Sequence, residues 1–259
     1  MVKIYYIVYA THEEGLFNEL VNNKYNVEIK VLGFGEKWNG YTDKYKAILN
    51  FINNNNLNDD DIIVSIDGFD SLINKDVTNI YNDFLKYDTK ILLSRDFDAF
   101  GNKYFGYNKF IFGKCNNVTA NAGLYMGFVK YLKVFLNNTL KYKCKDDQLI
   151  MNKLCHNSNF IKIDDKEVIF QNLTDKNNKS DAYIISYPFT LSFNRVYRSV
   201  FEKFQYFHKY ILFLFCIYLL YLYKNNKVYD NYYKIIMITI ILIIFYLKSD
   251  FTCINMKKY

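Results

Sequence analysis

Along the first 203 residues, short apolar runs alternate with longer segments in which apolar residues recur every three or four positions. The short runs end at polar turn residues and are typical of buried strands, whereas the three- and four-residue spacing is typical of amphipathic helices. Strands that alternate with helices predict an α/β domain with a mostly parallel sheet over residues 1–203. The predicted strands are Lys3–Tyr9, Val27–Leu32, Ile62–Ile66, Lys90–Ser94, Phe160–Ile163 and Val168–Gln171, and the predicted helices are Glu13–Val21, Asp43–Ile52, Thr78–Leu85 and Asp146–Leu154.

This alternation is interrupted in the second half of the domain. Residues 95–118 are aromatic and contain glycine, which predicts an irregular loop region. The segment Asn121–Phe128, with the sequence N-A-G-L-Y-M-G-F, begins with small residues and ends with apolar ones. We predict a turn at its start and a helix that follows it and ends near Leu136.

The last part of the chain consists largely of uncharged stretches. Tyr210–Tyr223 has 14 residues without charge and Ile235–Leu247 has 13, and lysines bound both. A membrane-spanning helix needs about 20 apolar residues, with a lower limit near 17. Each stretch reaches that length only with flanking aromatic residues and with lysines that extend to the membrane surface. We therefore predict a membrane-associated tail over residues 204–259, with one or two helices at about 206–223 and 232–248.

Three arrangements of this tail fit the pattern. A helical hairpin is one, a single span followed by an interfacial helix is the second, and a pair of buried helices in a soluble protein is the third. The first two are favoured because the stretches are apolar on all sides and no second soluble domain follows. Lysines flank every end, so the distribution of positive charge does not determine the orientation in the membrane.

Composition excludes some classes of function. The net charge is +7, but the lysines are scattered among aspartates and form no basic stripe, so no nucleic-acid partner is expected. The five cysteines are odd in number and form no C-x-x-C pair, which predicts free thiols and argues against a disulfide scaffold or a zinc site. The abundance of Asn, Lys, Ile and Tyr is typical of an AT-rich genome, such as that of a microbe or a large DNA virus.

Two carboxylates follow the predicted strand Ile62–Ile66, in the sequence I-D-G-F-D. Ligands bind beyond the carboxyl ends of the strands in parallel α/β sheets, so Asp67 and Asp70 are expected at a ligand site, on a turn eased by Gly68. Two close carboxylates repel each other unless one is protonated or a cation lies between them. Mn²⁺ or Mg²⁺ suits such oxygen ligands and binds substrate phosphates as well, as in sugar-nucleotide transferases. Alternatively, Asp67 ends the strand and Asp70 caps a following helix.

A second acidic pair, Asp146 and Asp147, opens the predicted helix Asp146–Leu154. These residues are candidates for contact with a substrate. Acidic side chains are also common at helix N-termini, where they interact favourably with the helix dipole, so a purely structural role is the alternative.

Six segments together resemble the glycosyltransferase domain of procollagen lysyl hydroxylases and of related enzymes that glycosylate hydroxylysine. They occur in the same order as in that family and extend over most of residues 3–200. They are I-V-Y-A-T-H-E-E-G (Ile7–Gly15), V-L-G-F-G-E-K-W-N-G (Val31–Gly40), I-D-G-F-D (Ile66–Asp70), N-A-G-L-Y-M-G-F (Asn121–Phe128), D-D-Q-L (Asp146–Leu149) and I-F-Q-N-L (Ile169–Leu173).

The resemblance implies a GT-A-like domain with a role for each matched residue. Asp67 and Asp70 would hold Mn²⁺, which binds the donor diphosphate, and Asp146 and Asp147 would orient or deprotonate the acceptor hydroxyl. The implied donor site has a nucleotide pocket lined by Thr11 and Trp38 and a close backbone approach to the sugar at Asn121, Ala122 and Gly123. Lys44 would contact the donor phosphates, because D-K-Y-K (Asp43–Lys46) also matches a basic helix start of the family.

The chain departs from the family at one motif. The family carries H-G-N-G-P near the end of the domain, where the histidine completes the metal site, whereas this chain reads I-I-S-Y-P at Ile184–Pro188. The sequence therefore supports two hypotheses. The first is a membrane-tethered transferase that moves a hexose from a UDP-sugar to a hydroxyl, with hydroxylysine of collagen-like chains implied as the acceptor. The second is a catalytically impaired, membrane-anchored pseudoenzyme or binding module of the same fold.

Overall fold

The computed structural model of the protein describes residues 2–96, 111–115, 118–156, 158–173, 177–188, 193–249, 251–253 and 256, with the backbone alone at 193–199 and 202. By its internal contacts the chain divides into two compact units, residues 1–190 and residues 191–256. The predicted loop region at 95–118 lies largely outside the described residues, which lack 97–110 and 116–117.

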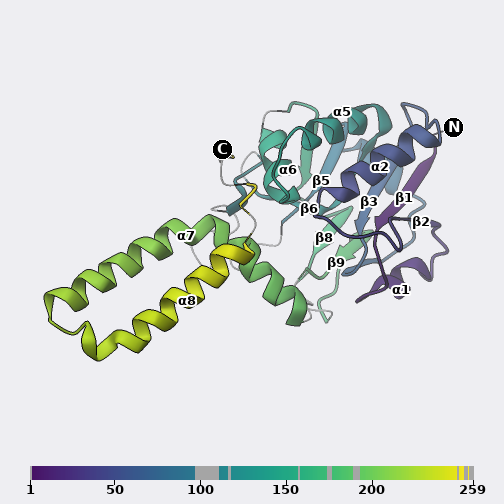
Figure 1. Ribbon diagram of the computed structural model, residues 1–259. Helices are drawn as coiled ribbons and strands as arrows, with labels where there is room; N and C mark the ends of the chain where they lie inside the picture. Colours follow the sequence, from purple (N-terminus) through teal and green to yellow (C-terminus); the bar gives the residue numbers. More distant parts are fainter. Residues whose placement is uncertain are drawn as a thin grey trace. The chain divides into compact units, whose positions relative to one another are not determined.

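A six-stranded sheet in the order β2-β1-β3-β6-β5-β7 forms the centre of the first unit (Figure 1). β1 is parallel to β2 and β3, and β5 is parallel to β7, whereas β6 lies antiparallel between β3 and β5. The predicted fold class, α/β with a mostly parallel sheet, is confirmed. The strands are β1 (Ile4–Tyr9), β2 (Ile29–Leu32), β3 (Ile62–Asp67), β5 (Ile91–Arg95), β6 (Ala120–Phe128) and β7 (Ile161–Asp164).

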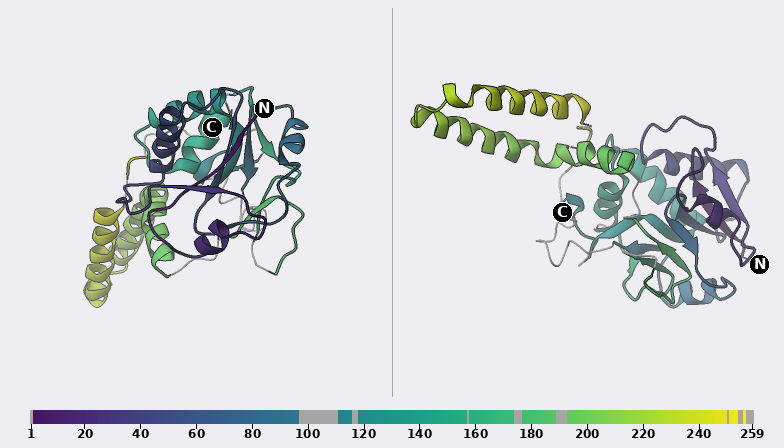
Figure 2. Two further views of the ribbon diagram at one scale, coloured as in Figure 1. Left: turned by 90° about the vertical axis from the view of Figure 1, so that its right-hand side faces the viewer. Right: turned by 90° about the horizontal axis from the view of Figure 1, so that it is seen from below.

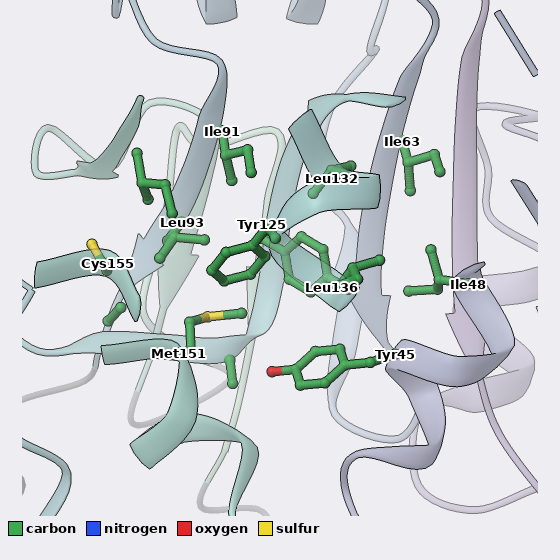
Figure 3. Close-up of a cluster of buried hydrophobic side chains, with 14 of the residues drawn as sticks. Tyr45, Ile48, Ile63, Ile91, Leu93, Tyr125, Leu132, Leu136, Met151 and Cys155 are labelled. Atoms are coloured by element: carbon green, nitrogen blue, oxygen red, sulfur yellow. The ribbon is translucent and has the colours of Figure 1, made fainter. Parts of the chain in front are cut away.

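Both faces of the sheet are covered, which explains why β3 is buried from Ile62 to Ile66 and is largely apolar there. On one face, Ile63 and Tyr125 of the sheet pack with Tyr45, Leu132 and Met151 of the covering helices (Figure 3). On the other face, a second cluster joins the alternate residues of β1 and β3 to two short helices and a small sheet in the order β4-β9-β8. The first face is covered by α2 (Asp43–Asn54), α5 (Val129–Leu140) and α6 (Asp147–His156), and the second by α1 (Phe17–Val21), α3 (Ile80–Leu85), β4 (Ser71–Ile73), β8 (Phe170–Asn172) and β9 (Ile184–Ser186).

The prediction of a turn at the start of Asn121–Phe128 is wrong. This segment belongs to β6, a central strand of nine residues, and the following helix α5 extends to Leu140. Its small residues serve close packing between strands, because a Cβ atom at Gly127 would lie 2.8 Å from the carbonyl oxygen of Lys90. The strands β4 and β9 were not predicted, since three residues are too few for a recognisable alternation.

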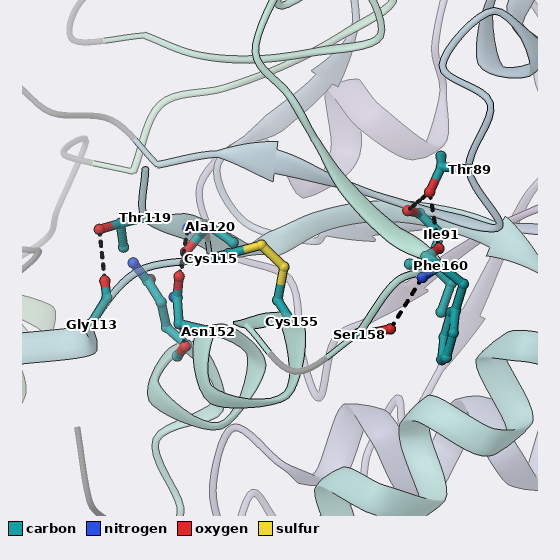
Figure 4. The surroundings of a disulfide bond; sticks show 11 residues. Thr89, Ile91, Gly113, Cys115, Thr119, Ala120, Asn152, Cys155, Ser158 and Phe160 are labelled. Carbon is teal, nitrogen blue, oxygen red and sulfur yellow. Dashed lines mark hydrogen bonds between the residues drawn. A yellow bond between two sulfur atoms is a disulfide. The ribbon is translucent and has the colours of Figure 1, made fainter. Parts of the chain in front are cut away.

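The prediction that all five cysteines are free thiols is also wrong. Cys115 and Cys155 form a disulfide, with Cα atoms 5.2 Å apart and a separation of 40 positions in the chain (Figure 4). Cys155 lies on α6, and Cys115 forms an isolated bridge with Val118, shortly before β6 begins. The long separation gave no sequence signal, because the two residues meet only when α6 packs on the sheet.

The second unit consists of two long helices that run antiparallel as a hairpin (Figures 1 and 2). They are α7 (Phe193–Lys224) and α8 (Tyr232–Lys248), and Asn226, in the left-handed conformation, ends the turn that leaves α7. Phe245 packs against Phe201 and Phe204, with ring centroids 4.7 and 5.3 Å apart. Within the described residues, 203–224 and 229–248 are long and apolar enough to cross a membrane, which is weak evidence of a membrane anchor.

Candidate functional site

One edge of the central sheet collects most of the predicted site residues. The parallel strands β1 and β3 end there, at Tyr9 and Asp67, which are paired with each other. Because β6 runs antiparallel to β3, its first residues lie at the same edge. The pairing of β3 with β6 extends to Ser65 opposite Tyr125, and beyond it a Cβ atom at Gly123 would lie 3.4 Å from the Asp67 Cβ atom. We call this edge the rim.

Asp67 ends β3 at the rim, where its side chain lies against Gly123. A Cβ atom at Gly123 would lie only 3.2 Å from Asp67 Oδ2, so the glycine leaves the space that this carboxylate occupies. The side chain is half-buried, and within the described residues it makes no hydrogen bond or ion pair. A partly buried carboxylate without such partners is free to bind a cation or a ligand.

Asp70 is held differently. It is buried, and its Oδ1 atom accepts hydrogen bonds from the hydroxyls of Ser71 at 3.3 Å and Ser186 at 3.0 Å. Its backbone carbonyl accepts the N–H of Tyr187 at 2.7 Å. The alternative in which Asp70 caps a helix is wrong, because the residues that follow it form the strand β4.

The turn between these two aspartates is fixed by a close backbone contact. Gly15 adopts a left-handed conformation with φ of +60°, and a Cβ atom there would lie 2.1 Å from the carbonyl oxygen of Phe69. The same carbonyl accepts the N–H of Leu16 at 2.8 Å. The segment after β1 therefore supports the Asp67–Asp70 turn, and only glycine fits at its contact point.

The start of β6 contributes backbone and amide groups to the rim. Asn121 Oδ1 accepts the N–H of Gly123 at 2.7 Å, and Asn121 Nδ2 donates to Asp96 Oδ1 at 3.4 Å. Ala122 is buried, and its carbonyl accepts a hydrogen bond from Lys44 Nζ at 2.8 Å. Asp96, which follows β5 as Asp67 ends β3, was not predicted as a site residue, although its position after a strand is the same signal.

Lys44 and Asp147 form an ion pair that is largely removed from water, with side chains 15% and 11% exposed. Burial raises the pKa of Asp147 above its usual range; the Lys44 ammonium opposes this shift, whereas the carboxylates of Asp146 and Asp67 add to it. Lys44 pairs with Asp147 and bonds Ala122, the neighbour of the Gly123 that lies against Asp67, so the two predicted acidic sites belong to one region. Lys44 joins this region to β6 through the Ala122 carbonyl.

Asp146 and Asp147 sit where α6 begins. Asp146 Oδ1 accepts the N–H of Leu149 at 3.0 Å, which is a helix cap, so the structural alternative holds for this residue. Asn152 fixes α6 against the sheet, because its side-chain amide bonds both backbone groups of Ala120, at 2.7 and 2.9 Å (Figure 4). The acidic start of α6 is thus held in register with the start of β6.

Thr11 and Trp38 lie on the two segments that leave β1 and β2. The carbonyl of Thr11 accepts the N–H of Gly35 at 2.9 Å, which joins these segments. Trp38 is 36% exposed and makes an edge-to-face contact with Tyr41, with centroids 5.3 Å apart. A Cβ atom at Gly40 would lie 3.4 Å from the Lys145 side chain, so the loop that carries Trp38 runs beside the residues that precede α6.

The geometry therefore brings Asp67, Asn121, Ala122 and Gly123 together at the rim and connects them, through Lys44, to Asp147. Among the residues that the structure describes, no group of three or more His, Cys, Asp or Glu side chains is arranged to hold a metal ion. Two residues of the divergent I-I-S-Y-P segment contact Asp70: Ser186 bonds its side chain, and the backbone N–H of Tyr187 bonds its carbonyl. A lone serine in a three-residue strand offers no sequence signal for such a contact.

An α/β domain with acidic and basic side chains gathered beyond the strand ends belongs to the class of enzymes that bind substrates at that edge. The family model described as "PLOD GT domain" matches residues 2–210. The chain therefore belongs to this family, which comprises the glycosyltransferase domains of lysyl hydroxylases. No curated protein matches the chain. The resemblance identified from the sequence motifs is confirmed.

Solved structures with a similar fold include two of the galactosyltransferase LgtC. The complex of LgtC with donor and acceptor sugar analogues is 16% identical, with a TM-score of 0.44, and the match covers 71% of this chain and 87% of that one. An active-site mutant of LgtC gives 15% identity with the same TM-score and coverage. A197 from STIV is 10% identical, with a TM-score of 0.35, and the match covers 51% of this chain and 68% of that one. The family match, rather than these likenesses, carries the functional conclusion.

Proposed function

We propose that this glycosyltransferase domain moves a hexose from a UDP-sugar to a hydroxyl acceptor, and that the chain is anchored to a membrane. Family membership supports the transferase class. The observation that carries the assignment of the site is Asp67, a carboxylate without hydrogen bond or ion pair in the described structure, placed against Gly123 where strand ends meet.

Asp67 and Asp70 fit a hard divalent cation, Mn²⁺ or Mg²⁺, because such ions prefer carboxylate oxygens and complete their shell with water and phosphate. The free carboxylate of Asp67 is the observation that supports this fit. When bound, the ion supplies positive charge that stabilises the diphosphate leaving group. Ser186 keeps Asp70 in place by donating to its Oδ1 atom.

The donor would lie along the rim between the loop with Thr11 and Trp38 and the start of β6. The donor sugar would lie against the backbone of Asn121, Ala122 and Gly123, where the missing side chain of Gly123 leaves room for the oxygens of Asp67 and Asn121. The ammonium of Lys44 has three donors, of which two are used by Asp147 and Ala122, so one remains for a donor phosphate.

Asp146 and Asp147 would face the acceptor. Burial and neighbouring carboxylates raise the pKa of Asp147, which makes it a better proton acceptor when ionised. Asp146 caps α6 and orients this pair. The acceptor class implied by the family is a protein hydroxyl, and hydroxylysine of a collagen-like chain is our specific proposal.

The membrane anchor is the α7–α8 hairpin. Its outward side chains are large and apolar over most of both helices, including Phe213, Leu214, Ile240 and Ile244, which are 43% to 65% exposed. Contact with lipid is more favourable for such an apolar surface than contact with water. Lysines at the ends of both helices can reach the headgroup region.

The proposal is tested with the full chain in detergent micelles. A panel of UDP-hexoses is incubated with Mn²⁺ and a hydroxylysine-containing collagen-like peptide, and UDP release is measured for the wild type and Asp67→Asn. We expect release with at least one donor and a loss of at least about 100-fold in the variant, typical of removing a group that stabilises developing charge. Equal turnover by the two proteins would refute the assigned site.

A pseudoenzyme is the second candidate. It is favoured by the absence, within the described residues, of any three-residue metal-ligand cluster and by the engagement of Asp70 with two serine hydroxyls. A pseudoenzyme would bind a glycan or protein partner without Mn²⁺-dependent affinity for UDP. Absence of UDP release with every donor, together with metal-independent ligand binding, selects this candidate.

A further inference from the structure

A cavity of about 370 Å³ opens at the end of the sheet opposite the rim. Its volume falls within the ~300–1,000 Å³ typical of small-molecule pockets. β1 runs from this cavity to the rim: Ile4–Tyr6 line the cavity, whereas Tyr9, its last residue, is paired with Asp67. The other walls are residues 25–28 and Lys30, around the start of β2, and residues 76–78, before α3.

Tyr6 is the notable side chain in this lining. It is only 7% exposed, and its hydroxyl makes no hydrogen bond within the described residues. Its oxygen is not among the atoms sealed in the core without a partner. Buried polar groups almost always have a partner, so an unpaired hydroxyl that reaches a cavity marks the position of a missing one.

Asp76 offers a matching acceptor in the same cavity. Its Oδ1 atom accepts both the N–H and the hydroxyl of Thr78, at 2.8 and 2.5 Å. Its other oxygen accepts no hydrogen bond in the part of the chain that the structure describes. Burial raises the pKa of Tyr6, and the Asp76 carboxylate adds to this shift, which places the two groups within electrostatic reach of each other. Both residues line the cavity, Tyr6 buried and Asp76 exposed, so a ligand hydroxyl there can accept from Tyr6 and donate to Asp76.

The rest of the lining suits an uncharged ligand. Lys30, the cation among the lining residues, is paired with Glu28, so no free positive charge is offered to a phosphate. Tyr25 donates its hydroxyl to the carbonyl of Asn74 at 2.6 Å, which fixes its ring at the wall. Aromatic rings beside hydroxyl, carboxylate and amide groups complement a molecule with apolar C–H faces and many hydroxyls.

We propose that this cavity is a saccharide-binding site, in which Tyr6 and Asp76 share one sugar hydroxyl. It goes beyond the proposed transfer reaction, because it lies at the other end of β1 from Asp67. The saccharide bound there is therefore not the sugar in transfer. A site of this kind would hold one part of a glycan while the transfer reaction takes place at the rim.

The test uses the full chain in a detergent without a sugar headgroup, with glucose, galactose and lactose as probes. Saturation-transfer NMR measures binding of each sugar to the wild type, Tyr6→Phe and Asp76→Asn. Tyr81→Phe is the matched control, because Tyr81 packs on the same face of the sheet and does not line the cavity. UDP with Mn²⁺ is added as a competitor for the rim.

We expect transfer to the ring protons of at least one sugar, with affinity about five-fold weaker in Tyr6→Phe and in Asp76→Asn, the loss typical of one hydrogen bond. Tyr81→Phe and added UDP should leave the signal unchanged. The proposal is overturned by no transfer to any of the three sugars, by displacement with UDP, or by equal affinity of the wild type and both variants. Because no turnover is measured, the result does not depend on the transferase proposal.

Discussion

Asp147 is a carboxylate that the fold has largely removed from water, and Lys44 is the cation beside it. The pair connects two elements, since Lys44 lies in the first turn of α2 and also donates a hydrogen bond to the Ala122 carbonyl at the start of β6. An ion pair in such surroundings is worth little compared with two well-packed apolar residues, but it is costly to break on one side only. Its presence at the rim is therefore better explained by chemistry than by stability.

Replacing Lys44 by methionine should destabilise the fold by about 3–5 kcal/mol, because Asp147 is left buried without its cation. The measurement is the free energy of unfolding from denaturant titration. Lys46→Met is the matched control: its side chain is 61% exposed and pairs with Asp43 at 3.6 Å, so a change below about 1 kcal/mol is expected. Equal losses in the two variants would contradict the account of the Lys44 pair.

The pH dependence of activity should report Asp147. A general base works only when ionised, and burial raises the pKa of this carboxyl, so activity should rise with pH through a value above that of an ordinary aspartate. The profile of kcat/KM against pH is measured for the wild type, Asp147→Asn and Asp146→Asn. We expect the acidic limb to disappear only in Asp147→Asn, and a limb that persists in this variant would assign the base elsewhere.

At the scale of elements, α6 is the part whose position matters most for the rim. Asn152 and the Cys115–Cys155 disulfide both tie it to the segment around the start of β6. The hydrogen bonds of Asn152 fix the position of α6 along β6, and the disulfide reduces the conformational freedom of the unfolded chain. Together they hold the acidic N-terminus of α6 near the first residues of β6.

Replacing Cys155 by serine should lower the free energy of unfolding by about 2–4 kcal/mol, the effect of opening a loop that the disulfide closes over 40 residues. Cys216→Ser is the control, because Cys216 is a free and exposed cysteine. Denaturant titration with and without reductant makes the measurement. If reductant leaves the denaturation midpoint of the wild type unchanged, the disulfide does not stabilise the fold.

The elements that were predicted well from the sequence are those with long apolar runs, such as β1 and β3. A strand in a sheet covered on both faces needs apolar residues at nearly every position, and such a run is easy to recognise. β6 was missed because glycine and asparagine, which usually break strands, are used here for close packing and for the rim. Asp67 was predicted as a site residue because it directly follows a clear apolar run, and the structure places it at the end of β3. Ser186 and the disulfide depend on contacts between distant segments, which no local pattern records.

At the scale of the whole molecule, the chain combines a domain of the PLOD GT family with a hairpin of two apolar helices. The α7–α8 contact is made by aromatic rings at the ends of the helices near Phe201 and Phe245, while the middle of each helix presents large apolar side chains outward. The outward apolar surface suits the proposed membrane anchor.

Aspartates in the middle of both helices, Leu214→Asp with Ile240→Asp, should prevent membrane association, since each charge at the bilayer centre costs about 3 kcal/mol. Flotation with phosphatidylcholine vesicles is the measurement, and Leu214→Ala with Ile240→Ala is the control. The wild type and the alanine variant should float, whereas the aspartate variant should stay at the bottom. A wild-type chain that remains soluble without detergent or vesicles would contradict the anchor.

The central claim is that Asp67 at the rim binds a divalent cation together with the donor nucleotide. Calorimetric titration of UDP into the full chain, with and without Mn²⁺, tests it most directly when wild type and Asp67→Ala are compared. The account predicts UDP binding that requires Mn²⁺ in the wild type and is at least about ten-fold weaker in the variant, a difference of ~1.4 kcal/mol. UDP affinity that is the same without the metal, or the same in both proteins, would contradict it.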